Sequence, residues 1–181
     1  MVAATVAAVT EPRYDGLLLA PVLATLDAAS GYGLVEDGAL AWKDGLLAYV
    51  GPRGGLPGDP ASLADEVVEA DGLVTPGLVD CHTHAVFAGD RAVEFELRLQ
   101  GASYEAIARA GGGILSTVRA VRACDEDALL RASEPRALAL LRDGVTTLEV
   151  KSGYGLDFDN ERKMLRVARA LGARLGIDVR T

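Results

Sequence analysis

The feature that most restricts the fold is the order of strand-like and helix-like segments after Asp71-Gly72. Apolar, β-branched stretches alternate there with stretches in which apolar residues recur at helical spacing. The expected elements are, in order, an extended segment at 73–84, helices at about 92–110 (broken near Gly101) and 114–123, a helix from Asp125 to Gly144 that Pro135 should kink or divide, a strand at 145–150, a helix from Asp157 or Asp159 to about Leu171, and a strand start at 177–179. This rhythm is typical of a parallel α/β sheet.

The number of strands bounds the architecture. About three parallel strands fit between residues 73 and 181, whereas a closed α/β barrel needs eight strands and roughly 250 residues. Because the chain stops at the start of a strand, we interpret it as truncated, with an open sheet edge. We therefore expect the isolated polypeptide to aggregate or to remain molten.

The region before residue 73 consists of short apolar runs and turns. Residues 39–42 and 46–50 flank Lys43-Asp44-Gly45, and an Asp-Gly pair between two apolar runs predicts a hairpin because the turn needs positive φ. Residues 51–60 are rich in Gly and Pro and read as a loop, and Val67, Val68 and Ala70 suggest one more strand. We expect two domains, a β domain at 1–72 and an α/β domain at 73–181.

Charge and cysteine content exclude several classes of protein. A net charge of −8 with scattered basic residues argues against nucleic-acid binding, and two cysteines are too few for a disulfide framework. The first twelve residues have no Lys or Arg before their apolar run, which makes them a poor signal peptide. No apolar stretch has the length of a membrane span, so a cytoplasmic protein without a membrane partner is expected.

The strongest chemical signal is the pair His82 and His84, which are the only histidines in the chain. Side chains alternate faces along a strand, so these two imidazoles should point the same way and could share one metal ion. Two core or surface histidines that happen to be near each other are the simpler alternative. The position at the end of an expected buried strand, after Pro76-Gly77, favours the metal site.

The segment around this pair, TPGLVDCHTH, resembles the first barrel strand of the amidohydrolase superfamily. The later segments HAVFAGDRAVEFELRLQGASYEAIARAGGGILSTVRA, GVTTLEVKSGYGLD and KMLRVAR are similar to the imidazolonepropionase family in particular. The resemblance runs from about Ala39 to the end of the chain. It implies the first part of a TIM-like (β/α)8 metallohydrolase barrel, preceded by the N-terminal part of a small β-sandwich domain.

That resemblance also implies an activity and a set of site residues. The family hydrolyses the cyclic amide 4-imidazolone-5-propanoate to N-formimidoyl-L-glutamate in histidine degradation. His82 and His84 match its first two ligands to one metal ion, divalent or trivalent, and imidazole suits zinc and iron alike. Arg91 matches the arginine that binds the substrate, and Tyr154 matches the tyrosine that contacts it. The remaining metal-ligating and substrate-binding residues have no match here, so the chain supplies only part of the site; a homodimer of the full-length protein is compatible with the family.

Simpler interpretations of the two substrate-binding residues stay open at this point. Arg91 could bind the propanoate as a bidentate fork, or it could form a surface ion pair with Asp90 or Glu94. Tyr154 follows a strand, where barrel active sites gather, but it could also pack over the barrel rim.

Nearby residues have structural explanations. Cys81 should face away from the metal as a packed core thiol, and Asp80 could support the metal site or only the strand. Gly111-Gly112-Gly113 lacks the Gly-Lys-Ser/Thr ending of a phosphate loop and should terminate a helix. Lys151 could form a buried ion pair, contact the substrate or remain solvated.

Three functions follow from these observations. The first is cyclic-amide hydrolysis of the imidazolonepropionase type. The second is another amidohydrolase, such as a deaminase or a dihydropyrimidinase, which would share the histidine pair but not the AGDR and KSGYG segments. The third is a non-catalytic fragment that folds only within a larger chain or complex.

Overall fold

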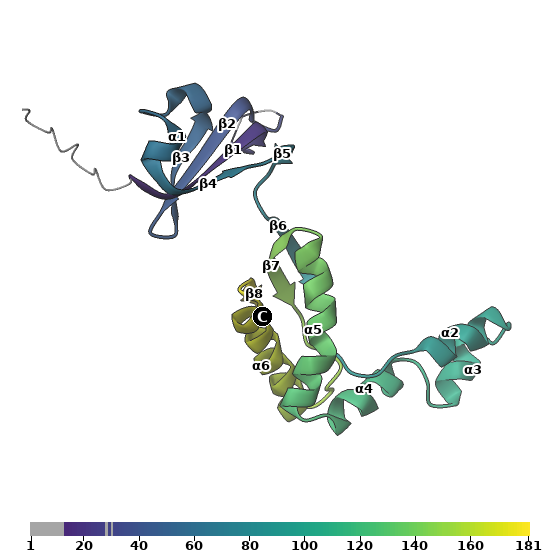
Figure 1. Ribbon diagram of the computed structural model, residues 1–181. Helices are drawn as coiled ribbons and strands as arrows, with labels where there is room; N and C mark the ends of the chain where they lie inside the picture. Colours follow the sequence, from purple (N-terminus) through teal and green to yellow (C-terminus); the bar gives the residue numbers. More distant parts are fainter. Residues whose placement is uncertain (1–12, 28, 30) are drawn as a thin grey trace, which may run out of the picture. The chain divides into compact units, whose positions relative to one another are not determined.

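The computed structural model describes residues 13–27, 29 and 31–181, so the signal-peptide interpretation of the first twelve residues lies outside the described part. The chain forms two compact units that meet between Pro76 and Gly77. Figure 1 shows a sheet-rich amino-terminal unit and a second unit of strands and helices.

The first unit is a single mixed sheet with two short helical turns. Its elements are β1 (Tyr14–Ala24), β2 (Leu34–Lys43), β3 (Leu46–Pro52), η1 (Arg53–Gly55), α1 (Pro60–Leu63), β4 (Ala64–Glu69) and β5 (Leu73–Val74). The strand order is β3-β2-β1-β4, and β5 also pairs with β1. The strand pairs β1–β2 and β2–β3 are antiparallel, whereas β4 and β5 run parallel to β1. All strands described between residues 13 and 76 belong to this sheet, so a second sandwich layer stays a prediction.

The hairpin predicted at Asp44-Gly45 is confirmed. Lys43 pairs with Leu46, which leaves a two-residue loop, and φ is 53° at Asp44 and 75° at Gly45. Positive φ at both loop positions is the geometry whose twist matches that of the flanking strands. The sequence did not predict the first half of β2, because residues 34–38 contain no continuous apolar run.

The second unit is a parallel sheet with helices packed on it. Its elements are β6 (Leu78–Thr83), α2 (Ala92–Leu99), α3 (Tyr104–Arg109), α4 (Ile114–Ala123), α5 (Glu126–Arg142), β7 (Val145–Val150), α6 (Phe158–Leu175) and β8 (Asp178–Arg180). The order is β6-β7-β8, with both pairs parallel, which confirms the three parallel strands expected from the sequence. The core forms where α5 and α6 pack against each other and the sheet, around Leu129, Leu148 and Met164.

Helix starts follow the predicted capping residues. The Asp125 side chain accepts a hydrogen bond from the Ala128 N–H at 2.7 Å and begins α5. Asp157, rather than Asp159, caps α6 by accepting from the Asn160 N–H at 2.9 Å. Such caps satisfy N–H groups that lack a partner within the helix.

Of the two effects expected of Pro135, a kink or a division of its helix, the division is wrong. α5 continues through Pro135 over 17 residues. Proline removes one hydrogen bond and strains the preceding turn, but Leu129, Ser133 and Ala137, on both sides of Pro135, are buried in this unit. Tertiary packing on that face therefore outweighs the local cost.

The segment 73–84 is interrupted at Pro76-Gly77, as the sequence predicts, but the expectation that it is buried is wrong. Leu73–Val74 pairs with β1 in the first unit, and only Leu78–Thr83 belongs to the second. Among the described strands β6 pairs with β7 alone, and its residues are largely exposed, with Leu78 at 53% and Val79 at 66%. Cys81 is exposed as well, so its interpretation as a core thiol is wrong. Within the described residues, every helix is too short or too polar to cross a membrane.

Candidate functional site

The end of β6 brings the two histidines together. Their ring centroids lie 5.4 Å apart in an edge-to-face arrangement, and the His82 side chain is 64% exposed. Asp80 pairs with Leu148 and Thr83 with Val150, so three steps along β6 match two along β7. This is a bulge of one extra residue, a device that redirects side chains at the end of a strand.

Three hydrogen bonds support this bulge. The Asp80 carboxylate accepts from the His82 backbone N–H at 3.3 Å, which gives Asp80 a role in the strand itself. The Thr83 hydroxyl donates to the Glu149 carbonyl at 2.8 Å, and the Lys151 N–H donates to the Thr83 carbonyl at 2.8 Å. The histidines therefore extend from a backbone that is fastened to β7.

Glu149 is a site residue that sequence reasoning missed. Its side chain is 21% exposed, and Oε2 lies 3.9 Å from His82 Nδ1. Lys151 forms an ion pair with the other oxygen, while Oε2 is buried and has no hydrogen-bond partner in the described part of the chain. A carboxylate on the Nδ1 side of an imidazole is the usual arrangement around a metal-ligating histidine. A carboxylate in an otherwise uncharged strand was the available signal.

The donor atoms fit part of a metal site. Two adjacent imidazoles suit a cation such as zinc, and the buried carboxylate oxygen of Glu149 lies on the Nδ1 side of one of them. Among the described residues, however, no group of three or more His, Cys, Asp or Glu side chains is arranged to hold a metal ion. Catalytic zinc sites use about three protein ligands, so the histidine pair fits as an incomplete ligand set.

Arg91 and Tyr154 line a common cavity beside His84. The cavity has a volume of about 300 Å³. The Tyr154 ring lies 5.6 Å from the His84 ring and 6.0 Å from the Phe87 ring, centroid to centroid. Arg91 donates from Nε to the Thr117 hydroxyl at 3.1 Å. The structure thus brings both predicted substrate-binding residues together, next to one of the two histidines.

Arg136 on α5 holds the segment between the histidines and Arg91. Its Nε donates to the Ala85 carbonyl at 2.9 Å and its Nη2 donates to the Phe87 carbonyl. The guanidinium carbon lies 3.6 Å from the centre of the Phe87 ring, a cation–π contact. Burial lowers the pKa of Arg136, but arginine keeps its charge in proteins. Sequence reasoning did not find this residue, because its partners are backbone carbonyls.

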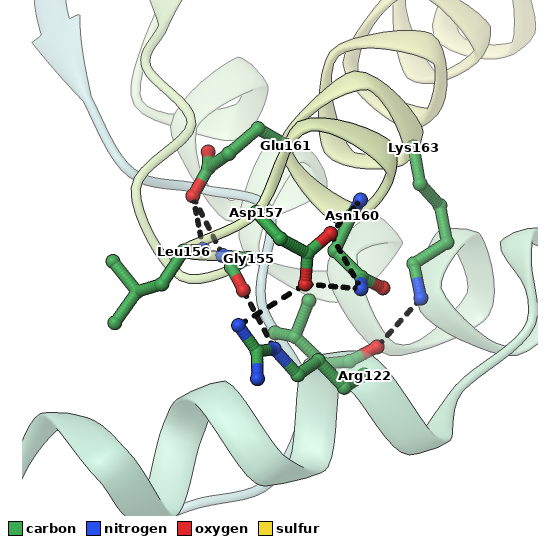
Figure 2. Close-up of polar contacts among 8 residues, drawn as sticks. Arg122, Gly155, Leu156, Asp157, Asn160, Glu161 and Lys163 are labelled. Atoms are coloured by element: carbon green, nitrogen blue, oxygen red, sulfur yellow. Dashed lines mark hydrogen bonds and ion pairs between the residues drawn. The ribbon is translucent and has the colours of Figure 1, made fainter.

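The loop that carries Tyr154 is anchored by Glu161 (Figure 2). Its Oε1 accepts from the N–H groups of Gly155 at 2.8 Å and Leu156 at 2.7 Å. Burial alone raises the pKa of Glu161, but the nearby Ser152 hydroxyl and the backbone N–H groups outweigh it, so the pKa is lowered. The N–H groups of Gly155 and Leu156 form hydrogen bonds with Oε1. The other carboxylate oxygen, Oε2, has no hydrogen-bond partner among the described residues.

The same loop is fastened to α4 (Figure 2). Arg122 donates from Nε to the Gly155 carbonyl at 2.7 Å and pairs with Asp157 at 3.0 Å. The pKa of Asp157 is lowered, mainly by the hydrogen bond from the Asn160 backbone N–H and next by the hydrogen bonds from the Asn160 side chain. Lys163 donates to two carbonyl groups at the end of α4, at 2.7 and 2.8 Å. Tyr154 therefore stands on a braced loop.

Comparison with known proteins gives close relatives among the imidazolonepropionases. The chain is 60% identical over 162 residues to an imidazolonepropionase of Paracoccus denitrificans, covering 88% of this chain and 40% of that protein. It is 60% identical over 151 residues to an imidazolonepropionase of Pseudomonas entomophila, covering 83% of this chain and 37% of that protein. It is 57% identical over 171 residues to one of Ralstonia nicotianae, covering 93% of this chain and 41% of that protein. The resemblance that the motifs indicated is confirmed. The chain spans about two fifths of the length of these relatives.

Solved structures share the fold at low sequence identity. A triazine hydrolase variant aligns with TM-score 0.61 and 16% identity over 90% of this chain and 34% of that one. An ochratoxinase from A. niger aligns with TM-score 0.57 and 18% identity over 91% of this chain and 30% of that one. A zinc-bound adenosine deaminase from Xanthomonas campestris aligns with TM-score 0.56 and 20% identity over 93% of this chain and 34% of that one. These likenesses show that the mixed α/β fold is that of part of these larger enzymes. No protein-family model matches the chain.

Proposed function

We propose that this chain is the amino-terminal part of an imidazolonepropionase, and that it supplies part of the site that hydrolyses 4-imidazolone-5-propanoate to N-formimidoyl-L-glutamate. The observation that carries this proposal is the cavity of about 300 Å³ that Arg91 and Tyr154 share beside His84. It offers an anchor for a carboxylate close to a histidine pair that suits a metal. The imidazolonepropionases that resemble the chain support the same reaction.

His82 and His84 would hold one metal ion, zinc or iron, together with ligands from outside this chain. A bound metal of this kind supplies Lewis-acid activation of water and of a carbonyl at neutral pH. Zinc in one structurally similar enzyme supports a divalent ion. Glu149 would hold the His82 ring from its Nδ1 side, which leaves Nε2 for the metal.

The other residues would bind and orient the substrate. Arg91 would bind the propanoate tail through a charged fork. Tyr154, held on its braced loop, would contact the ring, and Phe87 would exclude water from that side of the cavity. Holding the tail and the ring at fixed positions places the cyclic amide bond near the histidines, and positioning of this kind contributes much of an enzyme's rate.

The architecture belongs to the same proposal. Residues 1–72 would be the N-terminal part of a small β-sandwich domain, and residues 73–181 would be the first strands and helices of a TIM-like (β/α)8 barrel. In such a barrel the active site lies at the carboxyl ends of the strands, where His84 follows β6 and Lys151 follows β7. A homodimer of the full-length protein remains part of this expectation.

The test is hydrolysis of 4-imidazolone-5-propanoate by the complete gene product, beside the 181-residue chain alone. We expect N-formimidoyl-L-glutamate from the complete product only, detected by mass spectrometry. Dihydrouracil, a cyclic amide without a carboxylate tail, and adenosine test the alternative amidohydrolases. Turnover of either of these, without turnover of the imidazolone, would show that the proposed substrate is wrong.

A matched pair of variants tests the role of Arg91. Arg91→Gln removes the charged fork and should raise KM for the imidazolone by about 10- to 100-fold, because charge-assisted hydrogen bonds contribute about 1.5–3 kcal/mol. Arg98→Gln, which changes an exposed arginine on α2, the helix that begins directly after Arg91, should leave KM unchanged. Equal effects of the two substitutions would remove Arg91 from the substrate site.

A further inference from the structure

Thr117 is a buried hydroxyl in the middle of α4 that faces a charged group. Thr117 is 7% exposed, and its hydroxyl oxygen accepts a hydrogen bond from the Arg91 Nε–H at 3.1 Å. Both residues line the cavity of about 300 Å³, together with Phe87, Gly89, Asp90 and Tyr154. The contact therefore lies in the wall of the proposed substrate site rather than on an unrelated surface.

The two acidic neighbours of Arg91 are occupied elsewhere. Asp90 Oδ1 accepts from the Ala92 N–H at 3.0 Å, and Glu94 Oε2 accepts from the Gly113 N–H at 2.9 Å. Neither forms an ion pair with Arg91 in the described part of the chain. Among the described residues the surface ion pair considered from the sequence is thus not formed, and the guanidinium donates instead to the Thr117 hydroxyl.

The choice of nitrogen has a geometric consequence. A guanidinium offers a carboxylate two kinds of paired donors, one edge with Nε and a terminal nitrogen, and one end with both terminal nitrogens. Because Thr117 occupies Nε–H, only the end with both terminal nitrogens is left as a two-pronged donor. A carboxylate held there lies farther along the arginine axis than one held at the Nε edge.

We propose that Thr117 is a positioning residue that fixes the Arg91 guanidinium for end-on binding of a carboxylate, and that it thereby sets the depth at which an acidic tail binds. This inference rests on the proposed function for the identity of the ligand. It adds a residue that contributes to the selectivity of the substrate site for a carboxylate. Without the hydroxyl, the long arginine side chain regains rotational freedom, and ordering it again on binding lowers affinity.

The experiment uses the complete gene product and a probe that it does not hydrolyse. The probe is 3-(imidazol-4-yl)propanoate, which keeps the tail of the substrate but has no ring carbonyl, and its comparison ligand is the corresponding propanamide. Dissociation constants for both are measured by calorimetry. The ratio of the two constants reports selectivity for the carboxylate, independently of turnover.

Three variants separate the hydroxyl from its surroundings. Thr117→Val keeps the shape but removes the acceptor, and should reduce the preference for the carboxylate by about tenfold, the order expected for one hydrogen bond to a charged group. Thr117→Ser keeps the hydroxyl and should retain the preference. Ser116→Ala, the adjacent hydroxyl, which forms no hydrogen bond with Arg91 in the described structure, should also retain it.

An unchanged preference in Thr117→Val overturns the proposal, and so does an equal loss in Thr117→Ser, which would assign the effect to packing of the methyl group. If Thr117→Val does not fold, the wild-type protein still decides the matter. The Arg91 Nε–H signal in a nitrogen-15 NMR spectrum should exchange with water at least about tenfold more slowly than that of Arg98, because it is hydrogen-bonded. Equal exchange of the two signals would refute the contact.

The two proposals can fail separately. A protein that does not hydrolyse the imidazolone but loses carboxylate selectivity in Thr117→Val has a different substrate with an acidic tail, and Thr117 keeps its role. A protein that hydrolyses the imidazolone with unchanged selectivity in that variant keeps the proposed function, and Thr117 is then only a structural residue.

Discussion

Removing the charge of Glu161 should loosen the loop that carries Tyr154 (Figure 2). Glu161 lies in the first turn of α6 and accepts two backbone N–H groups of the loop, those of Gly155 and Leu156, on one oxygen. Glu161→Gln keeps the size of the side chain and one acceptor oxygen. The substitution therefore isolates the contribution of the negative charge.

The magnitude follows from these two hydrogen bonds. A hydrogen bond to a charged group contributes about 1.5–3 kcal/mol and one between neutral groups about 0.5–1.5 kcal/mol, so two weakened bonds cost about 2 kcal/mol before screening. Glu161 is only half-buried, and water reduces the effect to about 1–2 kcal/mol. Since about 1.4 kcal/mol corresponds to a factor of ten, the loop should open about five- to thirtyfold more often.

Hydrogen exchange at the amides of Gly155 and Leu156 measures this opening directly. In the complete gene product, both amides should exchange about five- to thirtyfold faster in Glu161→Gln. Glu105→Gln is the matched control, because Glu105 is exposed and its ion pair in the described part of the chain is with Arg109 on its own helix; it should leave the two amides unchanged. Unchanged exchange in Glu161→Gln would refute the anchoring role of the carboxylate.

The anchor should also depend on pH. Because the pKa of folded Glu161 is lowered, its contribution is fully present above the unfolded pKa of about 4.3. It is lost as the pH falls through the lower folded pKa. Protection of the two loop amides should therefore decrease below about pH 4 in the wild type and change less in Glu161→Gln.

Three further substitutions test the framework around the site by chemical denaturation of the complete gene product. Arg136→Met leaves the carbonyl groups of Ala85 and Phe87 without their charged donor and should cost about 3 kcal/mol, whereas a loss below about 1 kcal/mol would contradict its bracing role. Asp125→Ala removes the cap of α5 and should cost about 1 kcal/mol; no loss would mean that another group replaces the cap. Gly45→Ala places a side chain at φ 75° and should cost about 1 kcal/mol, whereas a gain in stability would contradict the turn geometry.

Local signals allowed much of the fold to be predicted. The positive φ values at Asp44-Gly45 and the cap at Asp125 depend on interactions within a few residues, and the sequence therefore contains them. Features that depend on distant contacts were missed or wrong. Pro135 remains helical because the face around it is buried, and Cys81 is exposed because β6 lies at the edge of the sheet that the described strands form.

The candidate site shows the same division. The histidine pair and the two substrate-binding residues could be predicted because they lie in recognisable motifs. Thr117, Glu149 and Glu161 could not, because each acts on a residue from another element or on loop backbone, which leaves no spacing in the sequence. Supporting residues of this kind are visible only when the chain is folded.

The most direct test of the metal site is the metal content of the complete gene product after dialysis, measured by mass spectrometry. Three substitutions at neighbouring positions are compared with the wild type: His82→Ala, His84→Ala and Cys81→Ala, the last removing an exposed thiol directly before the first proposed ligand. We predict about one zinc or iron per chain in the wild type and in Cys81→Ala, and less than about a tenth of that in either histidine variant. Full metal content in the histidine variants, or its loss in Cys81→Ala, would contradict the proposed metal site.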